Sequence, residues 1–156
     1  MAADDALPTV LTDDFGWTLR SVSIEFQHGA NAAVAGLPSG SRGYLVLLCA
    51  SEDNGESQLA IARRLGVDKT VMTYLVDALV EAGLIVREPD PADRRIRRLV
   101  LTDTGRARLD EARAQITAVE NRLLSTLSPA DAATFRSLLT AVAGIAGAAA
   151  SACDPA

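Results

Sequence analysis

Apolar residues recur at helical spacing along most of the chain. In the stretch 69–82 they return every three or four positions, which gathers them on one face of a helix and leaves the other face polar. That apolar face consists of Val71, Met72, Leu75, Val76, Leu79 and Val80. The spacing elsewhere predicts further helices at 13–35, 42–51, 58–65, 103–126 and from 129 onward. We therefore expect a mainly helical protein.

A different pattern follows the helix expected at 69–82. The short apolar segments 84–86 and 99–101 are typical of β-strands, and Pro89 and Pro91 mark a turn between them. The sequence therefore predicts a small β-hairpin, which makes the expected fold mainly α with a small β-hairpin wing (α+β).

The helices expected at 58–65 and 69–82 lie just before this hairpin and are joined at Gly66. Helix, turn, helix and hairpin in that order predict a winged helix-turn-helix. In such a domain one helix enters the DNA major groove, and the hairpin tip reaches a phosphate or the minor groove.

Residues that can cap a helix precede most of the predicted helices. These are Ser39 or Ser41, Ser57, Asp68, Thr102 and Ser128. Pro129 favours a helix start directly after Ser128, and Gly66 and Gly83 favour helix ends.

The predicted hairpin tip concentrates positive charge in an acidic protein. The net charge is −5 and the pI is about 4.8, yet the stretch 94–108 holds six arginines against one acid. DNA binding depends on local potential, and arginine suits bidentate contacts to phosphate and guanine. We expect Arg94, Arg95 and Arg97 to contact DNA. Asp93 is expected to fix the turn, either by pairing with Arg95 or by accepting backbone N–H bonds. A salt-bridged surface hairpin is the alternative.

The polar face of the helix at 69–82 is the candidate for reading bases. Lys69, Thr70, Thr73 and Tyr74 lie on it, and lysine and threonine near a helix N-terminus can bind base edges or phosphates. Threonine methyls and a tyrosine ring can contact thymine methyls. The alternative is a solvated helix face, which the arginine-rich hairpin makes the weaker interpretation.

The wing carries a recognisable signature. Asp93-x-Arg95-x5-Leu101-Thr102, together with the helix-turn-helix sequence before it, resembles the MarR family of multiple-antibiotic-resistance regulators over about 39–109. The resemblance implies a homodimer whose two winged domains read a palindromic double-stranded DNA operator. Relatives often carry an arginine or another polar group where Tyr74 and Ala78 stand, so their base preference does not transfer.

This resemblance also implies a division of the chain into functional parts. Residues 1–12 are expected to be disordered or loosely packed, and 39–102 to form the DNA-binding domain. The segments 13–38 and 103–152 are expected to form the helical dimerisation region. Their apolar faces have little else in a small domain to cover them.

Proteins of this kind are commonly released from DNA by a small aromatic or lipophilic inducer, which implies a repressor. Trp17, His28, Arg42 and Tyr44 are the residues expected near such a ligand, because aromatic walls with one or two polar groups suit a flat anion. Ordinary packing of Trp17 and Tyr44, and an exposed or core histidine, are the alternatives.

Other functional classes have little support in the sequence. It offers no catalytic motif, no metal-ligand cluster and no cofactor motif around its single histidine. Cys49 and Cys153 do not form a CxxC pair, and the apolar neighbours of Cys49 argue against a redox sensor. The run 137–153 is a poor membrane span, and no signal peptide opens the chain, so a cytoplasmic location is expected. The competing hypothesis is a winged-helix ligand-binding or protein-interaction module that does not bind DNA.

Overall fold

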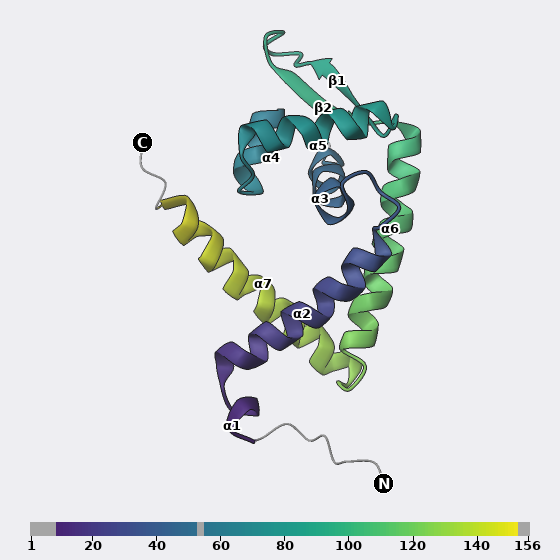
Figure 1. Ribbon diagram of the computed structural model, residues 1–156. Helices are drawn as coiled ribbons and strands as arrows, with labels where there is room; N and C mark the ends of the chain where they lie inside the picture. Colours follow the sequence, from purple (N-terminus) through teal and green to yellow (C-terminus); the bar gives the residue numbers. More distant parts are fainter. Residues whose placement is uncertain (1–8, 53–54, 153–156) are drawn as a thin grey trace. The chain divides into compact units, whose positions relative to one another are not determined.

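The computed structural model describes residues 9–52 and 55–152 (Figure 1). The chain forms two compact units, Met1–Glu120 and Asn121–Ala156. Within the segment 1–12, which was expected to be disordered or loosely packed, Thr9–Thr12 form the one-turn helix α1. The preceding residues lie outside the described part.

The first unit contains a helix-turn-helix followed by a hairpin, as the sequence predicted. Its further elements in chain order are α2 (Phe15–Ala33), α3 (Gly40–Ala50), α4 (Gln58–Arg64), α5 (Lys69–Glu81), β1 (Ile85–Pro89), β2 (Arg97–Leu101) and α6 (Asp103–Leu123), which runs on into the second unit. The second unit contains α7 (Pro129–Ala152). The fold class is confirmed as mainly helical with a β-hairpin wing.

Most helix starts follow the predicted caps. The Asp68 carboxylate accepts the N–H of Thr70 at 2.7 Å at the start of α5. The same arrangement opens three other helices, where the hydroxyls of Ser57, Thr102 and Ser128 accept the N–H three residues on. These short contacts satisfy amides that the helix itself leaves unpaired.

The start of α3 differs from this prediction. Ser39 precedes the helix but makes no side-chain cap bond, and its φ of 62° places it in the left-handed region. A capping side chain usually reaches back to the helix amides from an extended backbone, which Ser39 does not have. The hydroxyl of Ser41 donates instead to Asn31 on α2, so this serine joins two helices rather than capping one.

One hydrophobic core joins the helix-turn-helix, the hairpin, the end of α2 and α6. Its most deeply buried large side chains are Val34, Val46, Leu47, Ile61, Met72, Val76, Leu79, Ile85, Leu99 and Leu109. On α5 the inner face follows the predicted stripe except at its edges, where Val71 is 37% exposed and Val80 is half-buried. The opposite face of α5 is therefore held outward by burial of the first.

The wing is an antiparallel hairpin in which Ile85 pairs with Leu101 and Pro89 with Arg97. A third segment joins its edge: the N–H of Leu99 donates to the carbonyl of Glu56 at 3.1 Å, and Ser57 pairs with Arg98. Because Ser57 also caps α4, the base of the wing and the first helix of the helix-turn-helix share one backbone connection.

At the base of the wing, the C-terminal end of β2 passes directly into α6. The Thr102 hydroxyl donates to the carbonyl of Gly83 at 2.7 Å and accepts the N–H of Gly105 at 2.9 Å. A Cβ at Gly105 would lie 1.9 Å from the carbonyl oxygen of Leu84. This contact requires glycine, since no side chain fits in that space.

Candidate nucleic-acid interface

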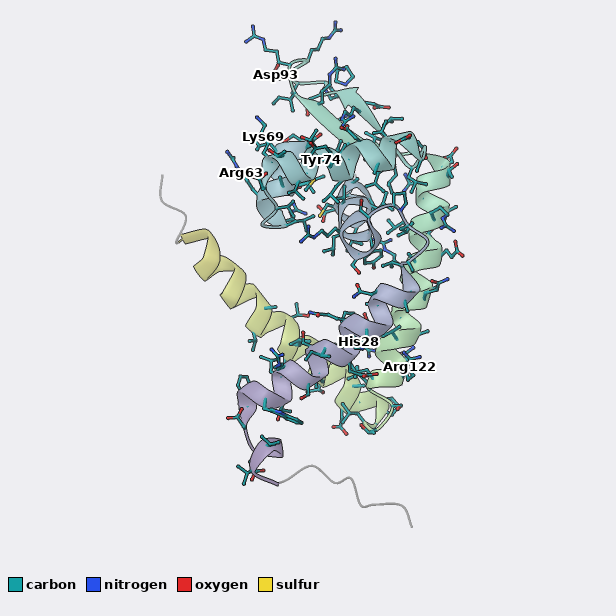
Figure 2. The ribbon with its side chains drawn as sticks, in the orientation of Figure 1. His28, Arg63, Lys69, Tyr74, Asp93 and Arg122 are labelled. Atoms are coloured by element: carbon teal, nitrogen blue, oxygen red, sulfur yellow. The ribbon has the colours of Figure 1, made fainter. Side chains whose placement is uncertain are left out.

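The outward face of α5 presents the residues that the sequence selected. Lys69, Thr70 and Tyr74 are exposed, Tyr74 to 72%, and Thr73 is half-buried. Figure 2 shows Lys69 and Tyr74 on α5, and Asp93 at the tip of the wing. The surface is polar except for the tyrosine ring, which projects into solvent.

The N-terminus of α5 is already occupied by a carboxylate. The N–H groups of Thr70 and then Val71 donate to Asp68 and lower its pKa below the usual aspartate value. These two amides are therefore not available to a DNA phosphate. A cation at this end comes instead from the exposed side chain of Lys69.

The hydroxyl of Thr73 is engaged on two sides. It donates to the carbonyl of Lys69 at 3.0 Å and accepts an N–H from Gln58 Nε2 at 3.1 Å. Gln58 lies at the start of α4 and was not among the residues predicted from the sequence. No local pattern marks it, because its partner stands on the other helix of the motif.

The tip of the wing is built from carboxylate–backbone contacts. Asp90 accepts the N–H of Ala92 at 2.7 Å and that of Asp93 at 3.3 Å. Asp93 in turn accepts the N–H of Arg95 at 3.0 Å, which is one of the two roles expected for it. Its carbonyl also accepts the N–H of Ile96. Asp90 and Asp93 therefore both hold the backbone of the turn that carries the arginines.

The four arginines between positions 94 and 98 fall into two groups, three exposed and one half-buried. Arg94, Arg95 and Arg97 are exposed and form no ion pair with a described carboxylate. Arg98 is half-buried, and its Nε lies 3.6 Å from Asp90 Oδ2. Of these four arginines, only Arg98 turns toward the base of the wing.

Two further cations border this surface and were missed in the sequence. Arg87 on β1 forms an ion pair with Asp77 on the outward face of α5. Arg63 is exposed on α4 (Figure 2), and it has no carboxylate partner in the described part of the chain. Exposed arginine near a helix-turn-helix could have been selected by charge alone, whereas the Arg87 contact depends on tertiary packing.

The four residues expected near a ligand are dispersed. Trp17 and His28 lie on α2, about 16 Å apart along its axis, and Arg42 and Tyr44 lie on α3. Trp17 and Tyr44 are half-buried, whereas the other two are exposed. One small aromatic ring cannot contact both Trp17 and His28 across that distance.

Tyr44 packs against the core from α3. Burial raises the pKa of its hydroxyl, with Arg113 opposing this shift and Glu120 adding to it. Arg113 and Glu120 both belong to α6. The phenol stays neutral over a wider pH range than a tyrosine in water.

A cavity of about 240 Å³ lies between the end of α2 and α6, and none of the four expected residues lines it. Its polar lining comes from Arg108, Glu111 and Gln115. Arg108 donates to the carbonyl of Gly36 at 3.1 Å and pairs with Glu111 at 2.7 Å. The cavity is thus bridged by protein contacts.

Other site types gain no support in the described residues. They contain no cluster of side chains that could hold a metal ion. Burial raises the pKa of the Cys49 thiol, which keeps it in the unreactive form at neutral pH. None of the described helices is long and apolar enough to cross a bilayer.

Comparison with known proteins gives the family. Residues 42–96 match the model of the MarR family. CouR from Rhodococcus jostii RHA1, in a crystal structure with p-coumaroyl-CoA, is 32% identical with a TM-score of 0.73, and the match covers 85% of this chain and 94% of that one. The chain belongs to the MarR family.

Two further structures support the assignment. A MarR-family transcriptional regulator from Rhodococcus sp. RHA1 is 30% identical with a TM-score of 0.73, over 85% of this chain and 96% of that one. The repressor CouR bound to a 23-mer DNA duplex is 30% identical with a TM-score of 0.74, over 89% of this chain and 99% of that one. This MarR-family protein is a DNA-binding transcriptional regulator and not an enzyme.

Proposed function

We propose that this MarR-family protein is a homodimeric repressor that binds a palindromic duplex and leaves it when a small aromatic or lipophilic molecule binds. One observation supports DNA binding above all: Arg94, Arg95 and Arg97 of the wing are exposed and have no carboxylate partners among the described residues. A protein-interaction module has no need for that density of unpaired positive charge.

The contacts divide between bases and backbone. Lys69, Thr70, Thr73 and Tyr74 occupy the face of α5 that would meet base edges in the major groove. The three exposed arginines suit phosphates or a narrow minor groove. Asp93 holds the tip in shape rather than touching DNA. Arg63 adds a cation on α4 for the flanking backbone.

Each unit leaves apolar side chains in solvent, which supports a homodimer. On α2, Phe15 is 79% and Leu19 is 50% exposed, and on α7 Leu138 and Val142 are each 62% exposed. Burying such residues against a second copy recovers the hydrophobic free energy that the isolated chain forgoes. Two-fold symmetry then places two recognition helices on a palindrome.

The inducer is proposed to be an aromatic acid or its thioester. The relative CouR is bound to p-coumaroyl-CoA in one structure and to a DNA duplex in another. In this chain, Arg42 and His28 offer polar groups for an anionic ligand, and Trp17 and Tyr44 offer aromatic surface. Their dispersal along two helices fits an extended ligand better than a single ring.

Binding of the full chain to DNA tests the main proposal. A duplex selected by the protein from a random-sequence library is titrated by fluorescence anisotropy at several salt concentrations, beside a scrambled duplex. We expect affinity for the selected duplex to fall steeply with salt. Arg95→Ala is expected to reduce the salt slope by about one, whereas Arg122→Ala, a matched loss of charge on the last turn of α6, leaves it unchanged.

The competing function gives a different result. A winged-helix module without DNA binding selects no sequence from the library and binds both duplexes equally and weakly. Equal salt slopes for wild type and Arg95→Ala would reject the wing as a DNA contact. Addition of p-coumaroyl-CoA tests the inducer class separately, since this extended thioester is expected to release bound duplex, and p-coumarate serves as the single-ring comparison.

A further inference from the structure

We propose that Thr73 reads a thymine through its methyl group, and that Gln58 is the positioning residue that holds Thr73 in the required rotamer. This inference rests on the proposed function, in which α5 enters the major groove. It names the chemical group that one side chain of α5 recognises. It also assigns a role to a residue on α4 that lies outside the recognition helix.

The hydrogen bonds of Thr73 limit what it can offer to DNA. A threonine hydroxyl has one hydrogen, and here that hydrogen is directed to the carbonyl of Lys69 at 3.0 Å. Donation to an acceptor such as guanine O6 or N7 is therefore closed to it. A lone pair of the same oxygen receives the N–H of Gln58 at 3.1 Å. The group without a hydrogen-bonding role is the Cγ2 methyl.

Thymine is the base that matches such a group. Among the base edges of the major groove, the C5-methyl of thymine is the apolar feature, and the others are hydrogen-bond donors and acceptors. Thr73 is half-buried, and Thr70 one turn before it and Tyr74 directly after it on α5 are exposed. If the thymine methyl packed against the Thr73 methyl, both groups would be removed from water, which favours binding.

Gln58 matters because threonine in a helix has a choice of rotamers. Its χ1 divides between two wells, which place Oγ1 and the methyl group in different directions. Gln58 spans from α4 to α5 and favours the well in which Oγ1 meets both Lys69 and the amide. Loss of that amide would free the hydroxyl to turn outward and exchange places with the methyl.

The test removes one methyl group at a time, first from the thymines of the DNA and then from Thr73 of the protein. Each thymidine of the selected duplex is changed in turn to deoxyuridine, which lacks the methyl and keeps its base pairing. We expect wild-type affinity to fall roughly three- to fivefold at one position in each half-site. Thr73→Ser, which keeps the hydroxyl and lacks the methyl, binds the thymidine and deoxyuridine duplexes equally at that position. Thr73→Val, which keeps a methyl and lacks the hydroxyl, still discriminates.

A double-mutant comparison isolates the role of Gln58. Gln58→Met has a similar size and lacks the amide, so it is expected to weaken discrimination between thymidine and deoxyuridine in the wild-type background. In the Thr73→Val background the same change has no effect, because valine presents methyls in either rotamer. An equal loss in both backgrounds would mean that Gln58 contacts DNA directly and would overturn its positioning role.

The remaining outcomes are equally decisive. If no thymidine is sensitive in wild type, or if Thr73→Ser keeps the wild-type penalty at every position, the methyl contact is wrong although the protein binds its duplex. If wild type selects no duplex at all, the proposed function fails first and this inference fails with it. Circular dichroism of each variant confirms that these conservative changes leave the fold intact.

Discussion

Arg87 of the wing forms an ion pair with Asp77 on the outward face of α5. The pair joins the two parts of the protein that are proposed to meet DNA. Its side chains are 31% and 55% exposed, so it adds little to stability, about 0–1 kcal/mol. Its main consequence is electrostatic: the carboxylate that α5 would bring toward a polyanion already has a cation beside it.

Removal of Arg87 should therefore weaken DNA binding more than it weakens the fold. Arg87→Met leaves Asp77 uncompensated, and we expect affinity for the selected duplex to fall on the order of fivefold, about 1 kcal/mol at the separation of a contact in water. The double variant Asp77→Asn/Arg87→Met should recover most of this loss in anisotropy titrations. A double variant no better than Arg87→Met would show that Arg87 contacts DNA itself.

The change in DNA affinity caused by Asp93→Ala distinguishes an electrostatic role of Asp93 from a structural one. Asp93→Ala removes a negative charge beside the arginines, which by electrostatics alone would tighten DNA binding. It also removes the acceptor of the Arg95 N–H, and we expect the loosened tip to bind more weakly. Asp93→Asn keeps an oxygen acceptor without the charge and should bind at least as tightly as wild type. Tighter binding by Asp93→Ala would contradict the structural role.

Gly105 should tolerate no side chain. A Cβ there would meet the carbonyl oxygen of Leu84 at 1.9 Å, so the start of α6 and the start of β1 would have to separate. We expect Gly105→Ala to lower the free energy of unfolding by about 1–3 kcal/mol in urea denaturation. Gly16→Ala on α2, where the nearest atom is 3.5 Å away, should instead be neutral or stabilising by up to about 1 kcal/mol. Equal effects would refute the close contact.

The cap at Asp68 should make stability depend on pH at the acid end. Because the N–H groups of Thr70 and Val71 lower its pKa below 3.8, the stabilisation is complete above that ordinary value. It is lost as the pH falls through the lower folded value. Asp68→Asn keeps a capping oxygen that does not titrate. The urea midpoint of wild type relative to Asp68→Asn should be constant near neutral pH and should decline below about pH 4. Parallel profiles down to acid would exclude this linkage.

The features that the sequence predicted correctly depend on neighbours a few residues apart. The caps at Ser57, Asp68 and Thr102 act within three residues, and the apolar stripe of α5 has a fixed period. The outward face of α5 followed from the same stripe, because burial of one side of a helix determines the other. Ser39 failed because its left-handed backbone cannot be inferred from its residue type.

The features that the sequence did not predict join distant segments. Gln58 meets Thr73 and Arg87 meets Asp77 only after the helix-turn-helix and hairpin have packed. The division of the wing arginines also needed the structure, since Arg98 turns inward because Asp90 and the base of the wing are there. Isolated aromatic residues such as Trp17 form no repeating pattern along the chain, so they were predicted as ligand contacts from their residue type alone.

The backbone connection between Glu56 and Leu99 affects how this regulator could change its target during evolution. Because the entry to α4 and the edge of β2 are hydrogen-bonded, the base of the wing and the helix-turn-helix share a fixed geometry. If α5 and the tip of the wing meet DNA as proposed, substitutions on the outward face of α5 change which bases are preferred, while the distance along the duplex between the groove contact and the tip contact stays the same. With that arrangement, proteins descended from this one would come to prefer different base sequences before they come to prefer sites of a different length.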